Sequence, residues 1–176
     1  MNEHGNEWFE DWFEPVARWT RWLDGAVTGG PGVLPPHWRL AIDTVRRDML
    51  HMQTGTKSYT WDCESALWNV YLDGNGTLIF DIRDLDGRIW VWTPEPTPAD
   101  CAEAEAISWT AGRVQDELIS DLWVLWPAFR DGPPMDVRTV EGRAVWTRSR
   151  SSNVVASVGD LARLQPKDNP DLRPTR

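Results

Sequence analysis

The longest amphipathic pattern in the chain lies between two prolines, in residues 97–126. Apolar residues recur there at spacings of three and four, which places them on one side of an α-helix: Ile107, Ala111, Val114, Leu118, Leu122 and Leu125. Thr97 and Pro98 are residue types that begin helices, and Pro127 cannot continue one. The pattern predicts a helix of about 29 residues, about 43 Å long, whose last turn is apolar on all sides and buried.

Two further helices are predicted before this long one. Residues 1–25 carry an aromatic stripe at helical spacing, formed by Trp8, Trp12, Val16, Trp19 and Leu23. Pro15 interrupts this helix and Gly25 ends it. The stripe packs either on the protein's own core or on a partner. Residues 35–54 form the second helix, which starts at a Pro-Pro pair and stops before a glycine.

The period changes to two in residues 56–93, which predicts an antiparallel meander. Its strands are expected at 57–61, 67–72, 77–83 and 88–93, with turns between them at Asp-Gly-Asn-Gly and Asp-Leu-Asp-Gly. Trp68, Val70, Phe80, Ile82 and Trp90 belong to the apolar face. The alternate positions are Asn69, Tyr71, Asp81 and Arg83. One face of the sheet is therefore expected to lie in the core.

A smaller β unit follows in residues 137–164. A Glu141-Gly142 turn joins strands at 137–140 and 143–147, then come a strand at 153–158 and a helical turn at 160–164. The proline-rich tail, 165–176, is expected to be disordered. The whole predicts one α+β domain over 1–164: two N-terminal helices, an antiparallel β-meander, one long helix packed on the sheet, and a small C-terminal β-hairpin unit.

The composition restricts the choice of partner. The net charge is -9, and thirteen residues are tryptophan. An acidic chain is poorly suited to bind nucleic acid through phosphates, or an anionic membrane surface. It suits a basic protein partner, and exposed tryptophans would favour an interface.

No pattern of catalytic or metal-binding residues is found. His4, His37 and His51 lack metal-ligand spacing, and no nucleotide-binding or hydrolase motif occurs. Cys63 and Cys101 are too few for a disulfide framework. The N-terminus has no signal-peptide pattern, and no apolar run is long enough to cross a membrane. We therefore expect a cytoplasmic protein without enzyme activity, cofactor or metal.

Acidic residues of the long helix are the predicted partner-binding site. Asp116, Glu117 and Asp121 lie near its C-terminal end, where the helix dipole is negative and acids do not help stability. Glu103 and Glu105 extend this set, and Trp8 and Trp12 add an aromatic contact. The pattern favours an immunity-protein or inhibitor-like domain that masks a basic partner surface. Two alternatives are a structural or adaptor subunit of a phage or phage-derived particle, and an enzyme with an unrecognised carboxylate site.

The C-terminal segments also resemble a known group. Trp126-Pro127, Pro133-Pro134-Met135, Gly142-Arg143-Ala144-Val145-Trp146 and the run from Ala156 to Leu161 are similar to the C-terminal part of small actinobacterial proteins. In that group, Trp-Pro-x-Cys and Trp-x-Cys segments suggest a zinc-ribbon-like hairpin. Here Phe129 and Arg148 occupy the cysteine positions. The resemblance therefore implies a bacterial or phage source and a helix–hairpin join, but no metal.

Overall fold

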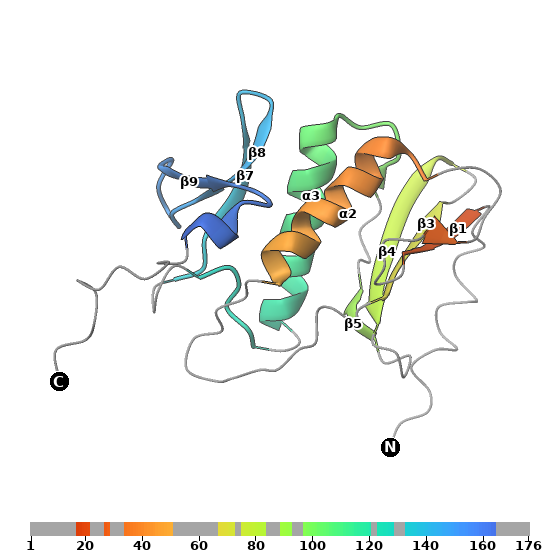
Figure 1. Cartoon of the computed structure of the whole chain (residues 1–176), viewed down its shortest axis with the longest axis horizontal. Helices are drawn as coiled ribbons and strands as arrows, with labels where there is room; N and C mark the ends of the chain where they lie inside the picture. Colours follow the sequence, from red (N-terminus) through yellow and green to blue (C-terminus); the bar gives the residue numbers. More distant parts are fainter. Residues whose placement is uncertain are drawn as a thin grey trace, which may run out of the picture.

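The computed structural model describes residues 17–21, 27–28, 34–50, 67–72, 75–83, 89–92, 97–120, 123–128 and 133–164. Within these ranges the fold is α+β, as predicted. Two α-helices, α2 and α3, stand between a larger and a smaller antiparallel sheet (Figure 1).

The larger sheet has the strand order β2-β1-β3-β4-β5, and β6 also pairs with β4. Its strands are β1 Ala17–Arg21, β2 Val27–Thr28, β3 Leu67–Leu72, β4 Thr77–Arg83, β5 Ile89–Trp92 and β6 Thr97–Pro98. The predicted bounds of β3 and β4 are confirmed. Their register pairs Trp68 with Ile82 and Val70 with Phe80, which aligns the apolar positions on one face.

Strand β1 overturns part of the predicted N-terminal helix. Residues 17–21 pair with β3, with Trp19 opposite Val70 and Thr20 opposite Asn69. Apolar Ala17 and Trp19 alternate here with polar Arg18 and Thr20, and Trp and Thr suit a strand. Trp19 fits both the helical stripe and this period-two alternation, so the local pattern is compatible with a helix or a strand. Pairing with β3 makes the segment a strand. The first sixteen residues fall outside the described ranges.

Helix α2, Pro36–Met49, confirms the second predicted helix. Its first residue is proline, and the Leu50 N–H bonds back to the Arg46 carbonyl oxygen at 3.1 Å. Residues 51–54, the predicted end, are not among those described.

Helix α3, Glu103–Ser120, is shorter than predicted at both ends. Thr97 and Pro98 form β6 instead of a helix start, with Thr97 paired to Leu78. A proline at a strand edge loses no ladder hydrogen bond, so it is as compatible with β6 as with a helix N-terminus. After Ser120, residues 123–126 are not helical, and Trp123 has a φ of 56° that a right-handed helix cannot contain.

The second face of the larger sheet is also buried, contrary to the prediction of a single core face. Asn69 is 3 %, Tyr71 4 % and Asp81 0 % exposed. These polar side chains satisfy one another, so their burial does not leave them without hydrogen bonds.

The smaller sheet has the order β7-β8-β9, built from β7 Asp136–Val140, β8 Arg143–Thr147 and β9 Val154–Ser157, and is followed by the 3-10 turn η1 Leu161–Leu164. Glu141 and Gly142 both have positive φ, 48° and 72°, as a two-residue hairpin turn requires. The predicted hairpin, third strand and helical turn are all confirmed.

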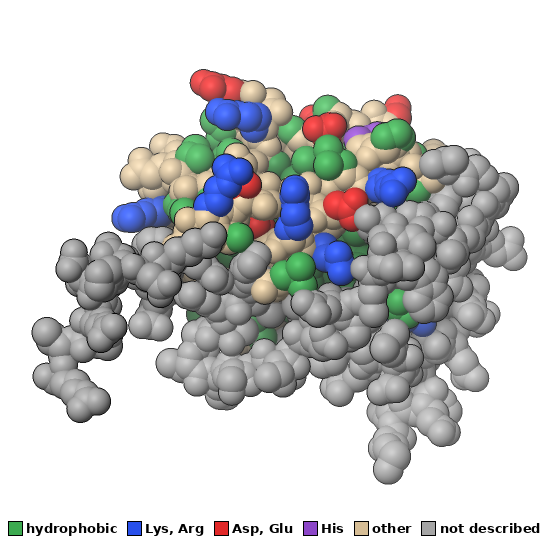
Figure 2. All heavy atoms as spheres, viewed as in Figure 1, with side chains coloured by type: hydrophobic (Ala, Val, Ile, Leu, Met, Phe, Trp, Pro, Cys, Tyr) green, Lys and Arg blue, Asp and Glu red, His purple; other side chains and the backbone are tan. Residues whose placement is uncertain are grey.

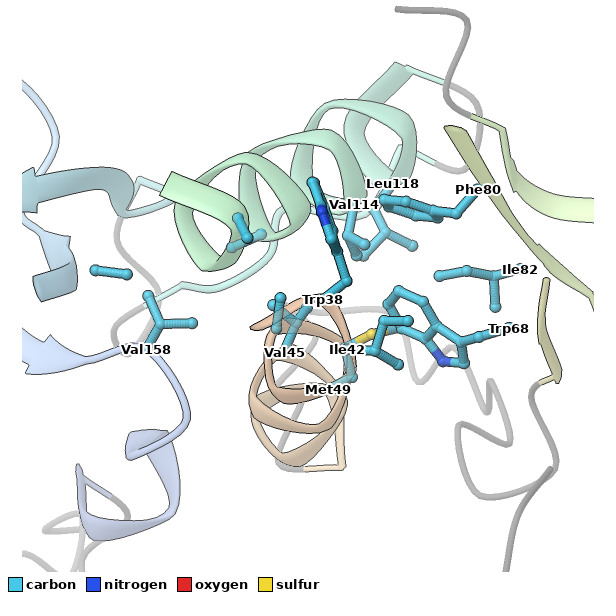
Figure 3. Packing of buried hydrophobic residues seen from close by; sticks show 14 of the residues in the cluster. Trp38, Ile42, Val45, Met49, Trp68, Phe80, Ile82, Val114, Leu118 and Val158 are labelled. Carbon is cyan, nitrogen blue, oxygen red and sulfur yellow. The ribbon is translucent and has the colours of Figure 1, made fainter. Parts of the chain in front are cut away.

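One apolar cluster joins the helices to both sheets (Figure 3). Trp38, Ile42, Val45 and Met49 enter it from α2, and Val114 and Leu118 from α3. The larger sheet supplies Trp68, Phe80 and Ile82, and the turn after β9 supplies Val158. Four members of the predicted core, Trp68, Phe80, Val114 and Leu118, are therefore confirmed. The Trp90 side chain and Leu122 lie beyond the described set.

Candidate functional site

The solvent-exposed charges of α3 are all acidic. Glu103, Glu105 and Asp116 are exposed, whereas Arg113, the helix's one basic residue, is half-buried. The other sides of α3 are covered. Ser108 shares a 2.8 Å hydrogen bond with Thr139 of β7, and Trp109 packs edge-on against Trp38 of α2. An acidic strip therefore remains where neither neighbour covers the helix.

Helical geometry decides which acids share this strip. Glu105 and Asp116 are eleven residues apart, close to three full turns, so they lie on the same side, separated by about 16 Å. Glu103 precedes Glu105 by two residues and points to a different side of the helix. The predicted acidic set is thus divided: the fold aligns Glu105 with Asp116 and does not align Glu103 with them.

Glu105 also has a structural role. Its Oε2 accepts a hydrogen bond from the backbone N–H of Ala102 at 3.1 Å, three residues earlier. This is the return contact of a capping box, and it satisfies a backbone donor at the start of α3. Glu103 and Glu105 also lie at the positive end of the helix dipole. Stability alone therefore explains acids at this end.

The acids at the other end lack this explanation. Asp116 and Glu117 occupy the C-terminal half of α3, whose last turn contains no basic residue. Asp116 is 62 % exposed, and its partner Arg113 stands at 3.6 Å, a loose pair worth little in water. Glu117 is half-buried. Asp121, Trp8 and Trp12, the remaining predicted site residues, lie outside the part of the chain that the structure describes.

The segment after α3 alternates between core and solvent. Val124 and Trp126 are 6 % and 1 % exposed, whereas Trp123 and Leu125 are 88 % and 48 % exposed. The prediction of an all-buried helical turn here was wrong, because an extended segment sends neighbouring side chains in opposite directions. It leaves the foot of α3 and runs towards the smaller sheet (Figure 1).

This segment is held firmly at its buried positions. The Val124 N–H donates to the Leu118 carbonyl oxygen at 2.8 Å, and Trp126 packs edge-on against Trp146. The side-chain amide of Gln115 donates to the carbonyl oxygens of Trp126 and Met135. At Trp123 the positive φ costs about 1–2 kcal/mol in a residue with a Cβ. The backbone is thus strained at the most exposed tryptophan of the described residues, a pattern often found at functional positions.

Two buried carboxylates carry chemistry that the sequence did not reveal. Asp81 is completely buried and accepts hydrogen bonds from Asn69 at 2.8 Å and Tyr71 at 2.7 Å. The Arg83 guanidinium donates from Nε to Asp81 Oδ1 at 2.8 Å and from Nη2 to Asp81 Oδ2 at 2.9 Å. This contact, opposed by burial, raises the pKa of the Arg83 guanidinium. The Asp81 oxygens are fully engaged, so this cluster serves the sheet rather than a substrate.

Asp48, near the end of α2, is the second buried carboxylate. Oδ2 accepts the Trp146 indole N–H at 2.7 Å and the Gly159 N–H at 2.6 Å, and Oδ1 accepts the Leu161 N–H at 2.9 Å. Burial raises the pKa of Asp48, against the opposing effect of these hydrogen bonds. The residue ties α2 to the smaller sheet and offers no oxygen to a ligand.

The described residues do not suggest a catalytic or metal centre. No three His, Cys, Asp or Glu side chains among them gather closely enough to hold a metal ion. His37 Nε2 donates to the Ala99 carbonyl oxygen at 2.8 Å, beside the indole N–H of Trp38. Burial, and then the charges of Glu105 and Asp100, raise the pKa of the Cys101 thiol, which keeps it protonated and a weak nucleophile.

The surface as a whole is not uniformly acidic. On the face shown in Figure 2, several basic side chains lie across the described surface with acidic ones between them. Helix α2 contributes exposed Arg39 and Arg47. The acidic strip of α3 is therefore a local feature rather than a consequence of net charge alone.

Comparison with protein-family models, curated proteins and solved structures finds no match for this chain. The resemblance of the C-terminal segments to actinobacterial proteins remains a prediction. Among the described helices, none combines the length and apolar character that a bilayer span needs.

Proposed function

We propose that this protein is a non-catalytic, cytoplasmic binding domain that masks the basic surface of another protein, as immunity proteins and inhibitors do. The observation that carries the proposal is the charge of α3: every exposed charged side chain is acidic, and the one arginine is half-buried. Acidic surfaces speed the encounter with basic partners and help select them.

The position of the acids supports binding over a purely structural role. Glu105 stabilises the start of α3, but Asp116 stands where the helix dipole opposes it, and its ion pair with Arg113 is long, at 3.6 Å. A helix shaped only for stability would place Lys or Arg there. The C-terminal end of α3 also contacts a segment with two exposed apolar side chains, Trp123 and Leu125, and protein interfaces combine polar and apolar contacts in this way.

The proposal is tested with the double variant Glu105→Gln/Asp116→Asn. Glutamine preserves the capping contact at Ala102, so the variant should fold normally while losing two charges from the strip. Wild-type and variant proteins are used to capture partners from a bacterial lysate, and each captured protein is then purified. The association rate is measured at several salt concentrations. We expect a basic partner whose association at low salt slows about tenfold with the variant.

A matched control removes two charges elsewhere. Glu141→Gln/Asp160→Asn changes the net charge equally but lies in the smaller sheet's turn and in the turn before η1. The control should associate close to the wild-type rate. Equal slowing by both variants would mean that net charge, and not the strip, guides association. A captured partner that is acidic, or an association rate independent of salt, would contradict the proposal.

A further inference from the structure

Trp123 is the most exposed large apolar side chain among the described residues, at 88 %. Its backbone is left-handed, with a φ of 56°. Val124 and Trp126, which follow it, are fixed by burial and by hydrogen bonds. The indole is therefore presented to solvent by a fixed backbone. Tryptophan is among the residues that contribute most to binding at protein interfaces.

The end of α3 beside the Trp123 segment is negative. The hydrogen bond from Val124 to the Leu118 carbonyl oxygen places this segment at the last turn of α3, where the helix dipole has its negative end. Asp116 and Glu117 precede that turn, and it contains no basic side chain. A negative potential beside the electron-rich face of an indole favours a cation, and an arginine guanidinium can also stack flat on the ring.

We propose that Trp123 receives an arginine side chain of the basic partner, with Leu125 covering the aliphatic part of that residue. This inference rests on the proposed function and names its central contact. Other occupants suit the site less well: acids repel anionic lipid and nucleic-acid phosphate, and a net charge of -9 opposes association with a second copy of this chain.

The test uses fluorine NMR of protein labelled with 5-fluorotryptophan. The thirteen tryptophans give separate signals, and the Trp123 signal is the one absent from Trp123→Phe. The probes are nonapeptides of arginine, lysine and glutamate. We expect arginine peptide at low salt to shift the Trp123 signal most, lysine peptide to shift it less, and glutamate peptide to leave it unchanged. The signal of Trp146, which is completely buried, should stay in place.

Affinity measurements separate an aromatic contact from a merely apolar one. Trp123→Leu should weaken binding of the arginine peptide about two- to fivefold, whereas Trp123→Phe retains part of the affinity. The control Leu125→Ala should change affinity less than Trp123→Leu. Equal affinities of the leucine variant and the wild type would overturn the inference.

The outcomes distinguish this inference from the proposed function. If the arginine peptide binds, and Glu105→Gln/Asp116→Asn weakens it while the Trp123 signal does not move, the inference fails and the proposed function stands. If no basic peptide binds at low salt, both fail. Sedimentation velocity tests whether a second copy of this chain contacts Trp123 instead. A wild-type dimer that Trp123→Leu abolishes would show this contact and would also overturn the inference.

Discussion

The two helices of the central layer, α2 and α3, pack side by side but end in opposite ways (Figure 1). The last turn of α2 contains Arg46 and Arg47, which complement the negative end of the helix dipole. The last turn of α3 contains no basic residue and is preceded by Asp116 and Glu117. One helix ends in the way that stability favours and the other does not, and this contrast is the basis of the proposed binding surface on α3.

The helices also differ in how they are joined to the rest of the fold. Near its end α2 carries the buried Asp48, whose oxygens receive three N–H groups from the smaller sheet and the turn after it. Helix α3 is held mainly by apolar side chains such as Val114 and Leu118, both 0 % exposed. These two kinds of attachment respond differently to mutation and to pH.

The largest effect is expected at the polar joint. Asp48→Ala leaves the buried N–H groups of Trp146, Gly159 and Leu161 without an acceptor, so it should reduce the free energy of unfolding by about 3–5 kcal/mol. Urea denaturation at neutral pH measures this difference. The control Asp160→Ala, close to the same joint but partly exposed, should change stability by less than about 1 kcal/mol.

The pH dependence of the stability difference between wild type and Asp48→Ala tests the role of Asp48 a second time. Burial raises the pKa of Asp48 in the folded protein above its ordinary value, which it keeps in the unfolded chain. Between the unfolded and the folded pKa the unfolded chain binds fewer protons than the folded one, so the contribution of Asp48 to stability falls as pH rises. The stability difference between wild type and Asp48→Ala should therefore be greatest at acidic pH and decrease through this window. A difference that grows with pH would contradict the raised pKa.

The apolar attachment of α3 is tested by Leu118→Ala. This side chain is completely buried, and its removal should cost about 2–5 kcal/mol through lost burial and the cavity left behind. Because no charge is involved, the loss should be nearly independent of pH, in contrast to Asp48→Ala. Denaturation at two pH values measures both properties, and a loss below about 0.5 kcal/mol would show that Leu118 is not part of the core.

The contrast between the helices also shows what the sequence could predict. Helix α2 is bounded by local signals, so its start at Pro36 was predicted closely. The ends of α3 depend on partners distant in sequence: β6 pairs Thr97 with Leu78, and Val124 bonds to the Leu118 carbonyl oxygen. Periodicity within a short window contains no information about such contacts. For the same reason residues 17–21, which contain Trp19 of the predicted aromatic stripe, were predicted as helix, whereas pairing with β3 makes them a strand.

The candidate site was predictable only in part. The acids of α3 stand out in the sequence because they oppose the dipole, and the structure leaves Asp116 exposed. The exposure of Trp123 was missed, since Leu122 to Trp126 is apolar throughout and fits a buried turn. No polar residue marks alternate positions in this run, so the sequence does not indicate which of its side chains are exposed. Contacts with distant residues decide which side chains face solvent: Val124 bonds to Leu118, and Trp126 accepts a hydrogen bond from Gln115.

Relief of strain at this segment should stabilise the protein modestly. Trp123→Gly removes the Cβ penalty of a positive φ and loses little burial, because the side chain is 88 % exposed. Glycine's greater freedom in the unfolded chain offsets part of this gain. We expect a net increase of about 0.5–1 kcal/mol in the free energy of unfolding, measured by urea titration, together with loss of the arginine contact. A clear loss of stability would mean that the indole packs on the fold in solution.

The smallest effect distinguishes the two helix ends directly. Asp116→Asn/Glu117→Gln removes two charges near the negative end of α3. Because the dipole effect weakens away from the last turn, each charge costs about 0.3 kcal/mol at low salt, the lower limit of such effects. The variant also loses the exposed pair of Asp116 with Arg113, worth about 0.3–0.5 kcal/mol, so the net gain should be a few tenths of a kcal/mol. The matched change on α2 is Arg47→Gln, which should lower stability by a similar amount because it removes a favourable charge. Thermal unfolding at low salt compares the two, and high salt should remove both differences, since screening weakens dipole interactions of exposed charges. If the α3 variant is instead less stable at low salt, its acids serve the fold, and the argument that they are kept for a partner fails.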